Sequence, residues 1–413
     1  MRGMKGGRAA GGAGRAAGML RAPGSQQQAT LVELFFDLVV VFALNRVVAF
    51  STSGMGSDSV AERWTTVVAG SLLVLPLIWV WSRMAYFTAR FEPRQGGAQV
   101  IVLATAFGLL LLGVAVPEAF DGTAVAFAGV YVVLQVGGSL LTAMATRGRP
   151  LHTLYLRTTC WYCVSAVPWL LGAVMHGVAQ ILLWSLAVAV DFGSARLGWP
   201  VPRLGRQRAS AWAHFPEHLA DRYRQLMLIA LGETILAVGI AYTDKSGFHS
   251  LTPTLGLVIA FLTTVLLWRI YFHTSGELFG KAIKSARNPA SLGRTAGAAH
   301  LAMIMGVVGT AVGHELVQTH TTTARTYPAW LAVIVGGPVA YLAGRALLEW
   351  VVFARLARRR LLGIGALLLL APPLAFAPPL AAVAVVTMVL LGIAVADTQR
   401  SVRHPDKAPA PPR

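Results

Sequence analysis

The chain has 413 residues, of which 55% are hydrophobic and only 13% carry a charge. Soluble domains carry charges on about a quarter of their residues, and the mean hydropathy here is +0.62, so an ordinary soluble fold is excluded. The net charge of +18 would suit nucleic acid, but the basic residues lie in short clusters between apolar runs. We therefore expect the lipid bilayer, and no nucleic acid, as the partner.

The two ends differ in composition from the rest of the chain. Residues 1–29 are basic and rich in Gly, Ala and Arg, and residues 399–413 are basic and rich in Pro. Such segments lack the apolar surface that a packed core needs. We expect both to be cytoplasmic tails, the first of them disordered, and residues 30–398 to form a transmembrane domain.

Apolar runs recur throughout residues 30–398, and their lengths approach or exceed what is needed to cross about 30 Å of hydrocarbon. The predicted fold is an all-α integral membrane bundle of about twelve transmembrane helices. The predicted spans are 31–50, 64–82, 98–116, 122–145, 155–175, 178–197, 224–243, 253–273, 296–315, 328–348, 361–377 and 379–397. The prolines between the last two runs are compatible with either a hairpin or a re-entrant bend.

The distribution of Lys and Arg gives an independent test of this count. When the connections are assigned to alternate sides, 29 basic residues fall on the side of the N-terminal tail and three on the other. The positive-inside rule then predicts an even number of spans, both termini in the cytoplasm and a multi-pass location in the cell (inner) membrane.

A long, basic connection, 198–223, divides the spans six and six. The predicted halves, 30–197 and 224–398, would enter the membrane in the same orientation, an arrangement known among transporters.

The first span contains two acids, Glu33 and Asp37, four residues apart. On a helix this spacing projects both from one face, and a bilayer penalises each by roughly 2.5–3.5 kcal/mol on insertion scales. Two carboxylates this close compete for a single charge, so proton exchange is one interpretation. The alternative is that Glu33 lies at the headgroups and Asp37 pairs with a neighbouring helix.

Two further acids lie within predicted spans, Asp191 in the sixth and Glu233 near the middle of the seventh. Intramembrane ionisable residues are functional candidates by default, and for Asp191 the alternative is an ion pair at the inner rim. We expect Asp37, Asp191 and Glu233 to converge on one polar cavity. Arg269 and Arg345 are the candidate counter-charges, although each lies close enough to a span end to extend toward the headgroups.

The histidines and cysteines indicate a functional site less clearly than the intramembrane acids do. His214 and Glu217, followed by His218, read H-x-x-E-H, an inverted zinc-hydrolase pattern, but Pro216 allows the required helix only if the helix begins there. We interpret this segment as an interfacial helix and predict no metal and no cofactor. His300, which opens the ninth span, is a candidate supporting polar group, and Cys160 and Cys163 lack the βαβ context of a redox motif.

Several motifs together resemble the bacterial low temperature requirement A family of integral membrane proteins. The most specific is Glu33-Leu-Phe-Phe-Asp37-Leu-Val-Val-Val-Phe-Ala-Leu44; the others are His214-Phe-Pro-Glu217, Leu231-Gly-Glu233, Asp191, Trp268 with Tyr271-Phe272, His300, and Gly337-Pro338 with Tyr341-Leu-Ala-Gly344. The resemblance covers roughly residues 29–397. This chain departs from the family pattern at three positions. His218 stands where the family usually has Arg, and Arg345 stands where His is common. His273 stands where an acidic residue often follows the Tyr-Phe pair. The family name describes a growth phenotype, so the resemblance implies an architecture and no catalytic residue.

The leading functional hypothesis is a proton- or cation-coupled transporter with Glu33, Asp37, Asp191 and Glu233 along its pathway. An intramembrane enzyme acting on a lipid or lipid-linked substrate is an alternative, but it needs an acid/base or nucleophile set at one depth. A non-transporting sensor or scaffold is the third hypothesis. The identity of a small-molecule or ion substrate and the oligomeric state stay open.

Overall fold

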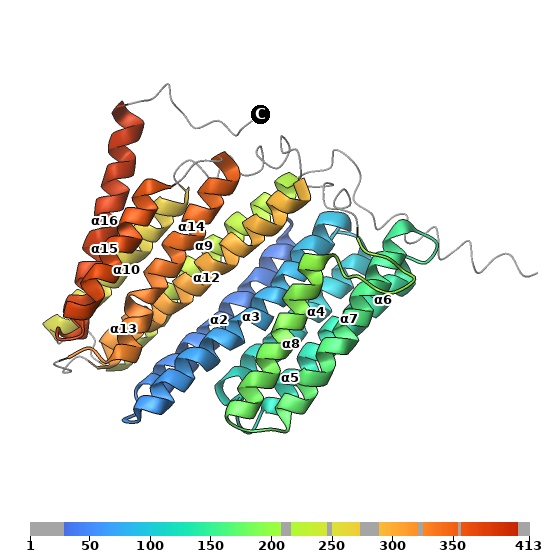
Figure 1. Cartoon of the computed structure of the whole chain (residues 1–413), viewed down its shortest axis with the longest axis horizontal. Helices are drawn as coiled ribbons and strands as arrows, with labels where there is room; N and C mark the ends of the chain where they lie inside the picture. The colour runs from blue at the N-terminus through green and yellow to red at the C-terminus, as the bar shows by residue number, and fades with distance from the viewer. Residues whose placement is uncertain are drawn as a thin grey trace, which may run out of the picture. The chain divides into compact units, whose positions relative to one another are not determined.

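The computed structural model describes residues 29–207, 216–245, 250–272, 289–320, 325–353 and 357–403. The predicted tail 1–29 lies outside these ranges except for Ala29, and so do residues 404–413 of the other tail. Apart from isolated bridges, no strand occurs in the described residues, which are overwhelmingly helical (Figure 1). Helices satisfy their backbone hydrogen bonds internally, which is the condition for crossing lipid.

In the described residues, each of the twelve predicted spans is helical over most of its length. The helices are α2 (Leu31–Met55), α3 (Val60–Arg90), α4 (Gly96–Ala115) with η1 (Val116–Glu118), α5 (Ala124–Val132), η2 (Val133–Gly137), α6 (Gly138–Ala145), α7 (Pro150–Ala173), α8 (Val178–Leu197), α9 (Pro216–Lys245), α10 (Leu251–Phe272), α12 (Pro289–Thr319), α13 (Pro328–Ile334), α14 (Gly336–Phe353), α15 (Arg358–Leu374) and α16 (Pro379–Arg403). Within the described ranges, nine helices, counted with their continuations, are long and apolar enough to cross a membrane. The prediction of an all-α bundle with about twelve helices is confirmed.

Several helix ends follow directly from the sequence. Five helices, α7, α9, α12, α13 and α16, begin at a proline, which suits the first helical turn because no intrahelical partner exists there for an N–H. Gly198 ends α8 with φ of 81°, a left-handed conformation that glycine adopts without a Cβ penalty. α9 begins at Pro216, earlier than the predicted span at 224, so His218 is helical.

The proline-rich junction near the C-terminus is a turn between two helices. α15 ends at Leu374, α16 begins at Pro379, and the two helices pack against each other. Of the two interpretations of this junction, the structure has the helical hairpin. α16 is long enough to cross the membrane, and α15, with 17 residues, lies at the lower limit for a spanning helix.

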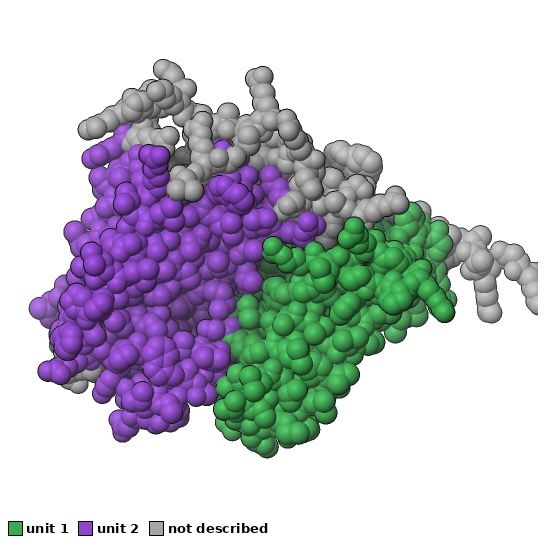
Figure 2. All heavy atoms as spheres, in the orientation of Figure 1, with its two compact units in different colours: residues 1–43, 72–219 green, residues 44–71, 220–413 purple. Residues whose placement is uncertain are grey.

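The chain divides into two compact units (Figure 2). Unit 1 comprises residues 1–43 and 72–219, and unit 2 comprises residues 44–71 and 220–413. Helices α2, α3 and α9 each have residues in both units. The predicted division into halves 30–197 and 224–398 stays a prediction.

Within each unit the helices pack through small residues and present large apolar side chains outward. In unit 1, α7 packs on α8, α6 and α5; in unit 2, α12 packs most extensively on α14. Phe107 and Leu369 are 61% and 79% exposed. A soluble protein avoids continuous exposed apolar surface of this kind, whereas a bilayer solvates it. The chain is a multi-pass helical membrane protein.

Candidate functional site

Glu33 is completely buried at the N-terminus of α2. Its Oε2 accepts hydrogen bonds from the backbone N–H of Thr30 at 2.8 Å and from the Thr30 hydroxyl at 2.9 Å. A glutamate that reaches back to the N–H three residues earlier is half of a capping box. Its Oε1 lies 3.1 Å from Nε2 of His218 in the first turn of α9. These contacts give Glu33 a structural role in fixing the start of α2.

Asp37 lies one helical turn further along α2 and is also completely buried. Its Oδ1 accepts a hydrogen bond of 3.0 Å from the indole N–H of Trp81 in α3. Glu33 and Asp37 therefore have different partners, although they share a helix face as the spacing predicts.

Asp191, on α8 in unit 1, is 1% exposed. The Tyr131 hydroxyl donates to its Oδ2 at 2.8 Å, and the Trp169 indole N–H lies 3.5 Å from the same oxygen. The contacts continue from Tyr131 to Gln135 and from Gln135 to Arg83 of α3. Asp191 is thus the end of a buried polar network drawn from α3, α5, η2 and α8, and no direct ion pair with Asp191 occurs in the described residues.

Glu233 lies near the middle of α9, in unit 2, and is fully buried. Its Oε1 accepts a hydrogen bond of 3.2 Å from the side-chain amide of Asn45 on α2, and its Oε2 has no hydrogen-bond partner among the described residues. Glu315 of α12 lies near enough for the two carboxylates to interact electrostatically, and the Thr52 side chain lies within hydrogen-bonding reach of Glu315. Two acids, Glu233 near the middle of α9 and Glu315 near the C-terminal end of α12, therefore lie near the neutral polar side chains of Asn45 and Thr52 on α2.

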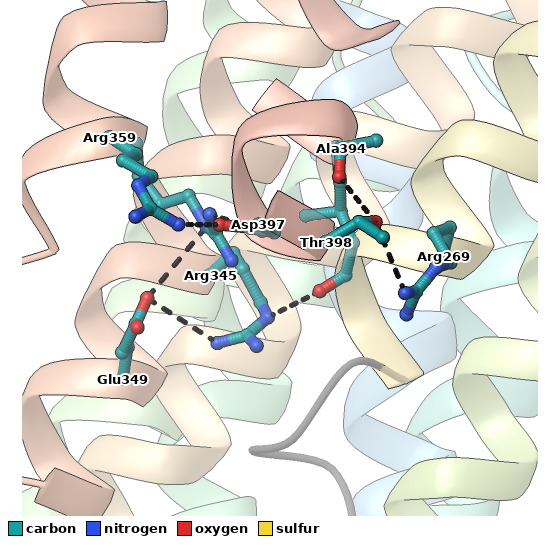
Figure 3. A network of polar contacts seen from close by, with 9 residues as sticks. Arg269, Arg345, Glu349, Arg359, Ala394, Asp397 and Thr398 are labelled. Carbon is teal, nitrogen blue, oxygen red and sulfur yellow. Dashed lines mark hydrogen bonds and ion pairs between the residues drawn. The ribbon is translucent and has the colours of Figure 1, made fainter. Parts of the chain in front are cut away.

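The two candidate counter-charges belong to a separate network within unit 2 (Figure 3). Arg345 is 1% exposed. Its Nε donates to the Ile270 carbonyl at 3.0 Å, and its Nη1 lies 3.9 Å from Glu349. Arg269 donates to the Thr398 hydroxyl at 3.3 Å. Neither arginine forms an ion pair with Glu233.

The same network pairs the other buried acid of unit 2 with cations. Asp397 of α16 lies 3.0 Å from Arg359 and 2.6 Å from Arg360, both on α15, and Arg360 also lies 3.7 Å from Glu349 (Figure 3). These ion pairs connect α14, α15 and α16. They are the arrangement expected of intramembrane charges that serve the fold.

His300 on α12 is held by two hydrogen bonds. Its Nδ1 lies 2.7 Å from the Ala296 carbonyl, and its Nε2 lies 2.9 Å from the Tyr271 hydroxyl. A carbonyl only accepts, so Nδ1 carries the hydrogen and the neutral ring receives the Tyr271 proton at Nε2. Tyr223 stacks on the ring with centroids 4.3 Å apart. His300 joins α9, α10 and α12 in unit 2.

The remaining sequence-predicted residues lie at the start of α9. Glu217 is half-buried in the first turn of α9, and the interfacial position of this segment stays a prediction. His214 lies outside the described residues. Over the described ranges, no group of three or more His, Cys, Asp and Glu side chains could hold a metal ion.

Sequence reasoning missed the partners of the acids. The sequence places Arg83 among the basic residues of one side, and it does not identify Asn45, Gln135 and Glu315 as partners of the acids. Their polarity could have identified them, because each of these four residues has an amide or charged side chain within or beside an apolar run. The predicted convergence of Asp37, Asp191 and Glu233 stays a prediction.

Comparisons with known proteins agree with the motifs. Residues 28–395 match the family model described as bacterial low temperature requirement A protein (LtrA). An uncharacterized protein, RA0937 of Rhizobium meliloti (strain 1021), is 32% identical over 330 residues, which is 77% of this chain and 76% of that protein. No solved structure matches. The length of the family match, together with this relative, shows that the chain belongs to the bacterial low temperature requirement A protein family.

Proposed function

We propose that this protein is a proton- or cation-coupled transporter in which Glu233 is the coupling carboxylate. The observation that supports the proposal is the environment of Glu233. It is fully buried in the middle of a membrane-spanning helix, its one hydrogen bond comes from the neutral amide of Asn45, and its charged neighbour is another acid, Glu315.

An isolated carboxylate in an apolar interior is destabilised by several kcal/mol even after relaxation. The destabilisation is removed when the group binds a proton or a cation. A second carboxylate nearby reinforces this effect because the two cannot easily both be ionised. Glu233 therefore has a physical reason to take up one positive charge and to release it when its surroundings change.

Two other buried acids provide an internal comparison. Asp397 contacts two arginines, and Glu33 caps a helix and contacts His218. These two acids are thus provided with cations or a backbone donor. Glu233 lacks both in the part of the chain that the structure describes, which favours an exchangeable ligand at Glu233.

The orientation that accompanies this proposal has both termini and the 198–223 connection in the cytoplasm and the protein in the cell membrane. It is supported by the 29 basic residues assigned to one side against three on the other. The substrate is a small molecule or an ion. Its coupled movement would require Glu233 to become accessible from each side in turn.

The experiment measures proton movement into or out of proteoliposomes that contain the full chain and an entrapped pH-sensitive dye. A panel of inorganic cations and small organic solutes is added outside under an imposed pH gradient. We expect one solute class to change the internal pH with wild type and with Glu62→Gln, a control at an exposed acid, but not with Glu233→Gln. An equal response from folded Glu233→Gln would contradict the proposal.

A further inference from the structure

The buried network around Asp191 in unit 1 consists of hydrogen bonds whose directions can all be assigned. A guanidinium has only donors, so Arg83 donates to Oε1 of Gln135. The amide nitrogen of Gln135 then donates to the Tyr131 oxygen at 3.0 Å, and the Tyr131 hydroxyl, having one hydrogen, donates to Oδ2 of Asp191 at 2.8 Å. Every bond points from the cation toward the carboxyl group.

This orientation gives Asp191 an indirect positive partner. Aligned hydrogen bonds polarise one another in an apolar interior, so the charge of Arg83 favours negative charge on Asp191 without direct contact. An indirect partner stabilises the ionised form less than an ion pair does. The network is therefore suited to a carboxyl group that gains and loses a proton, and less suited to one that is permanently ionised.

An irregular turn in the middle of an otherwise apolar helix builds the network. Residues Val133–Gly137 form a π-helical turn, η2, between α5 and α6. Arg83 donates through Nη1 to the carbonyls of Leu134 and Gln135 at 3.0 and 3.1 Å. A Cβ on Gly138 would lie 2.7 Å from Nη2 of Arg83, so glycine leaves room for the guanidinium. π turns inside α-helices occur frequently at functional sites.

The second oxygen of Asp191 provides the position for a proton. Oδ1 is buried and has no hydrogen-bond partner among the residues that the structure describes. Ser165 of α7 lies beside the carboxyl group, and its hydroxyl donates to the Tyr162 carbonyl at 3.3 Å. The lone pairs of Ser165 Oγ are thus available to accept a hydrogen from Oδ1. A carboxylic acid with its proton on Oδ1 uses Oδ2 as the carbonyl oxygen that Tyr131 already contacts.

The charged and titratable groups that act on Asp191 from the helices around it are Arg83 of α3, Tyr131 of α5 and Tyr162 of α7. Aromatic rings also pack around the network. The Trp169 ring centroid lies 4.7 Å from that of Tyr131 and 5.2 Å from that of Trp184. Such packing favours a proton over a solvated cation as the ligand, because a cation would need further oxygen atoms.

We propose that Asp191 is a proton-binding site of unit 1, with the proton on Oδ1, and that Arg83, Gln135 and Tyr131 are positioning residues that favour its release. Binding moves one proton to Oδ1 from the aqueous phase, and release returns it. The proposal does not depend on transport or on Glu233.

The test is pH-difference infrared spectroscopy of the full chain in lipid nanodiscs, which needs no solute. We expect one protonated-carboxyl C=O band to be absent in Asp191→Asn and retained in Glu233→Gln. If Asp191→Asn does not fold, Tyr131→Phe can assign the band to Asp191 instead, because it removes the hydrogen bond that Asp191 accepts. Loss of the hydrogen bond to Oδ2 strengthens the C=O bond, so the band moves to higher frequency. Tyr327→Phe, at an exposed tyrosine of unit 2, leaves the band in place.

Arg83→Gln tests the relay. Removing the positive charge leaves more of the protonated form at a fixed pH, so the band should disappear at a higher pH than in wild type. Arg147→Gln, at an exposed position, should leave that pH unchanged. Absence of any band that responds to Asp191→Asn or Tyr131→Phe would overturn the proposal. A band that responds to both, in a protein without solute-dependent proton movement, would reject the transporter and retain the proton site.

Discussion

Oε1 of Glu33 and Nε2 of His218 lie 3.1 Å apart, and both side chains are completely inaccessible to solvent. The contact joins the first turn of α2 to the first turn of α9. It therefore connects the motif that begins at Glu33 with the segment that begins at His214-Phe-Pro-Glu217.

His218→Ala should destabilise the protein by about 1–3 kcal/mol, because truncation removes the polar contact of a buried carboxyl oxygen at 3.1 Å. His218→Arg should retain most of the stability, since a guanidinium supplies a charge-assisted hydrogen bond. Thermal unfolding of the detergent-solubilised protein measures both, with His176→Ala, at an exposed loop residue, as the control. Equal melting temperatures for wild type and His218→Ala would show that the contact contributes nothing.

Glu233→Gln should abolish or strongly reduce activity while the protein remains in the membrane, and Glu33→Gln should impair activity less. The reason is the difference in partners: Glu33 is held by Thr30 and His218, whereas Glu233 has Asn45 alone among its described hydrogen-bond donors. The measurement is solute-dependent proton movement in proteoliposomes at matched protein content. Loss of activity in Glu33→Gln together with full activity in Glu233→Gln would reverse the ranking.

The helices were predictable because a bilayer permits few alternatives. A long apolar run must form a helix in order to satisfy its backbone, so α4, α10 and α16 follow from hydropathy alone. The polar partners were not predictable, because the hydrogen bond between Asn45 and Glu233 joins residues 188 positions apart. A single sequence does not contain the register of one helix on another. The π turn at Val133–Gly137 was equally hidden, because its composition is that of the helix around it.

Gly309 and Gly313 lie where α12 packs closely against α14 and α13, respectively. A Cβ on Gly309 would lie 3.2 Å from the Gly337 Cα, and one on Gly313 would lie 3.1 Å from the Ile334 Cα. The closest approach lies one turn earlier. A Cβ on Gly306 would lie 2.4 Å from the backbone nitrogen of Tyr341, a contact with main chain that no rotamer change relieves.

Gly306→Ala should therefore destabilise the protein by about 1–3 kcal/mol through overpacking. Gly365→Ala is the matched control: Gly365 is an exposed helical glycine on α15, and nothing lies within 4 Å of its Cβ position. It should be neutral or stabilising by about 0.5–1 kcal/mol, because alanine loses less backbone entropy in a helix. Unfolding temperatures in one detergent compare the two. A stable Gly306→Ala variant would mean that α12 and α14 can separate without loss of stability.

Arg206→Cys and Lys245→Cys should react with membrane-impermeant thiol reagents from opposite sides of the membrane. Arg206 precedes α9 and Lys245 is its last residue, and the 30 residues of this helix cover about 45 Å at 1.5 Å per residue, more than the hydrocarbon thickness. Cys160 and Cys163 are exposed, so both must first be replaced by Ser. With right-side-out vesicles we expect labelling at position 245 alone, and with inverted vesicles at position 206 alone. Labelling of both from one side would contradict the even-span topology, because the 29 to 3 division of basic residues depends on α9 crossing the membrane.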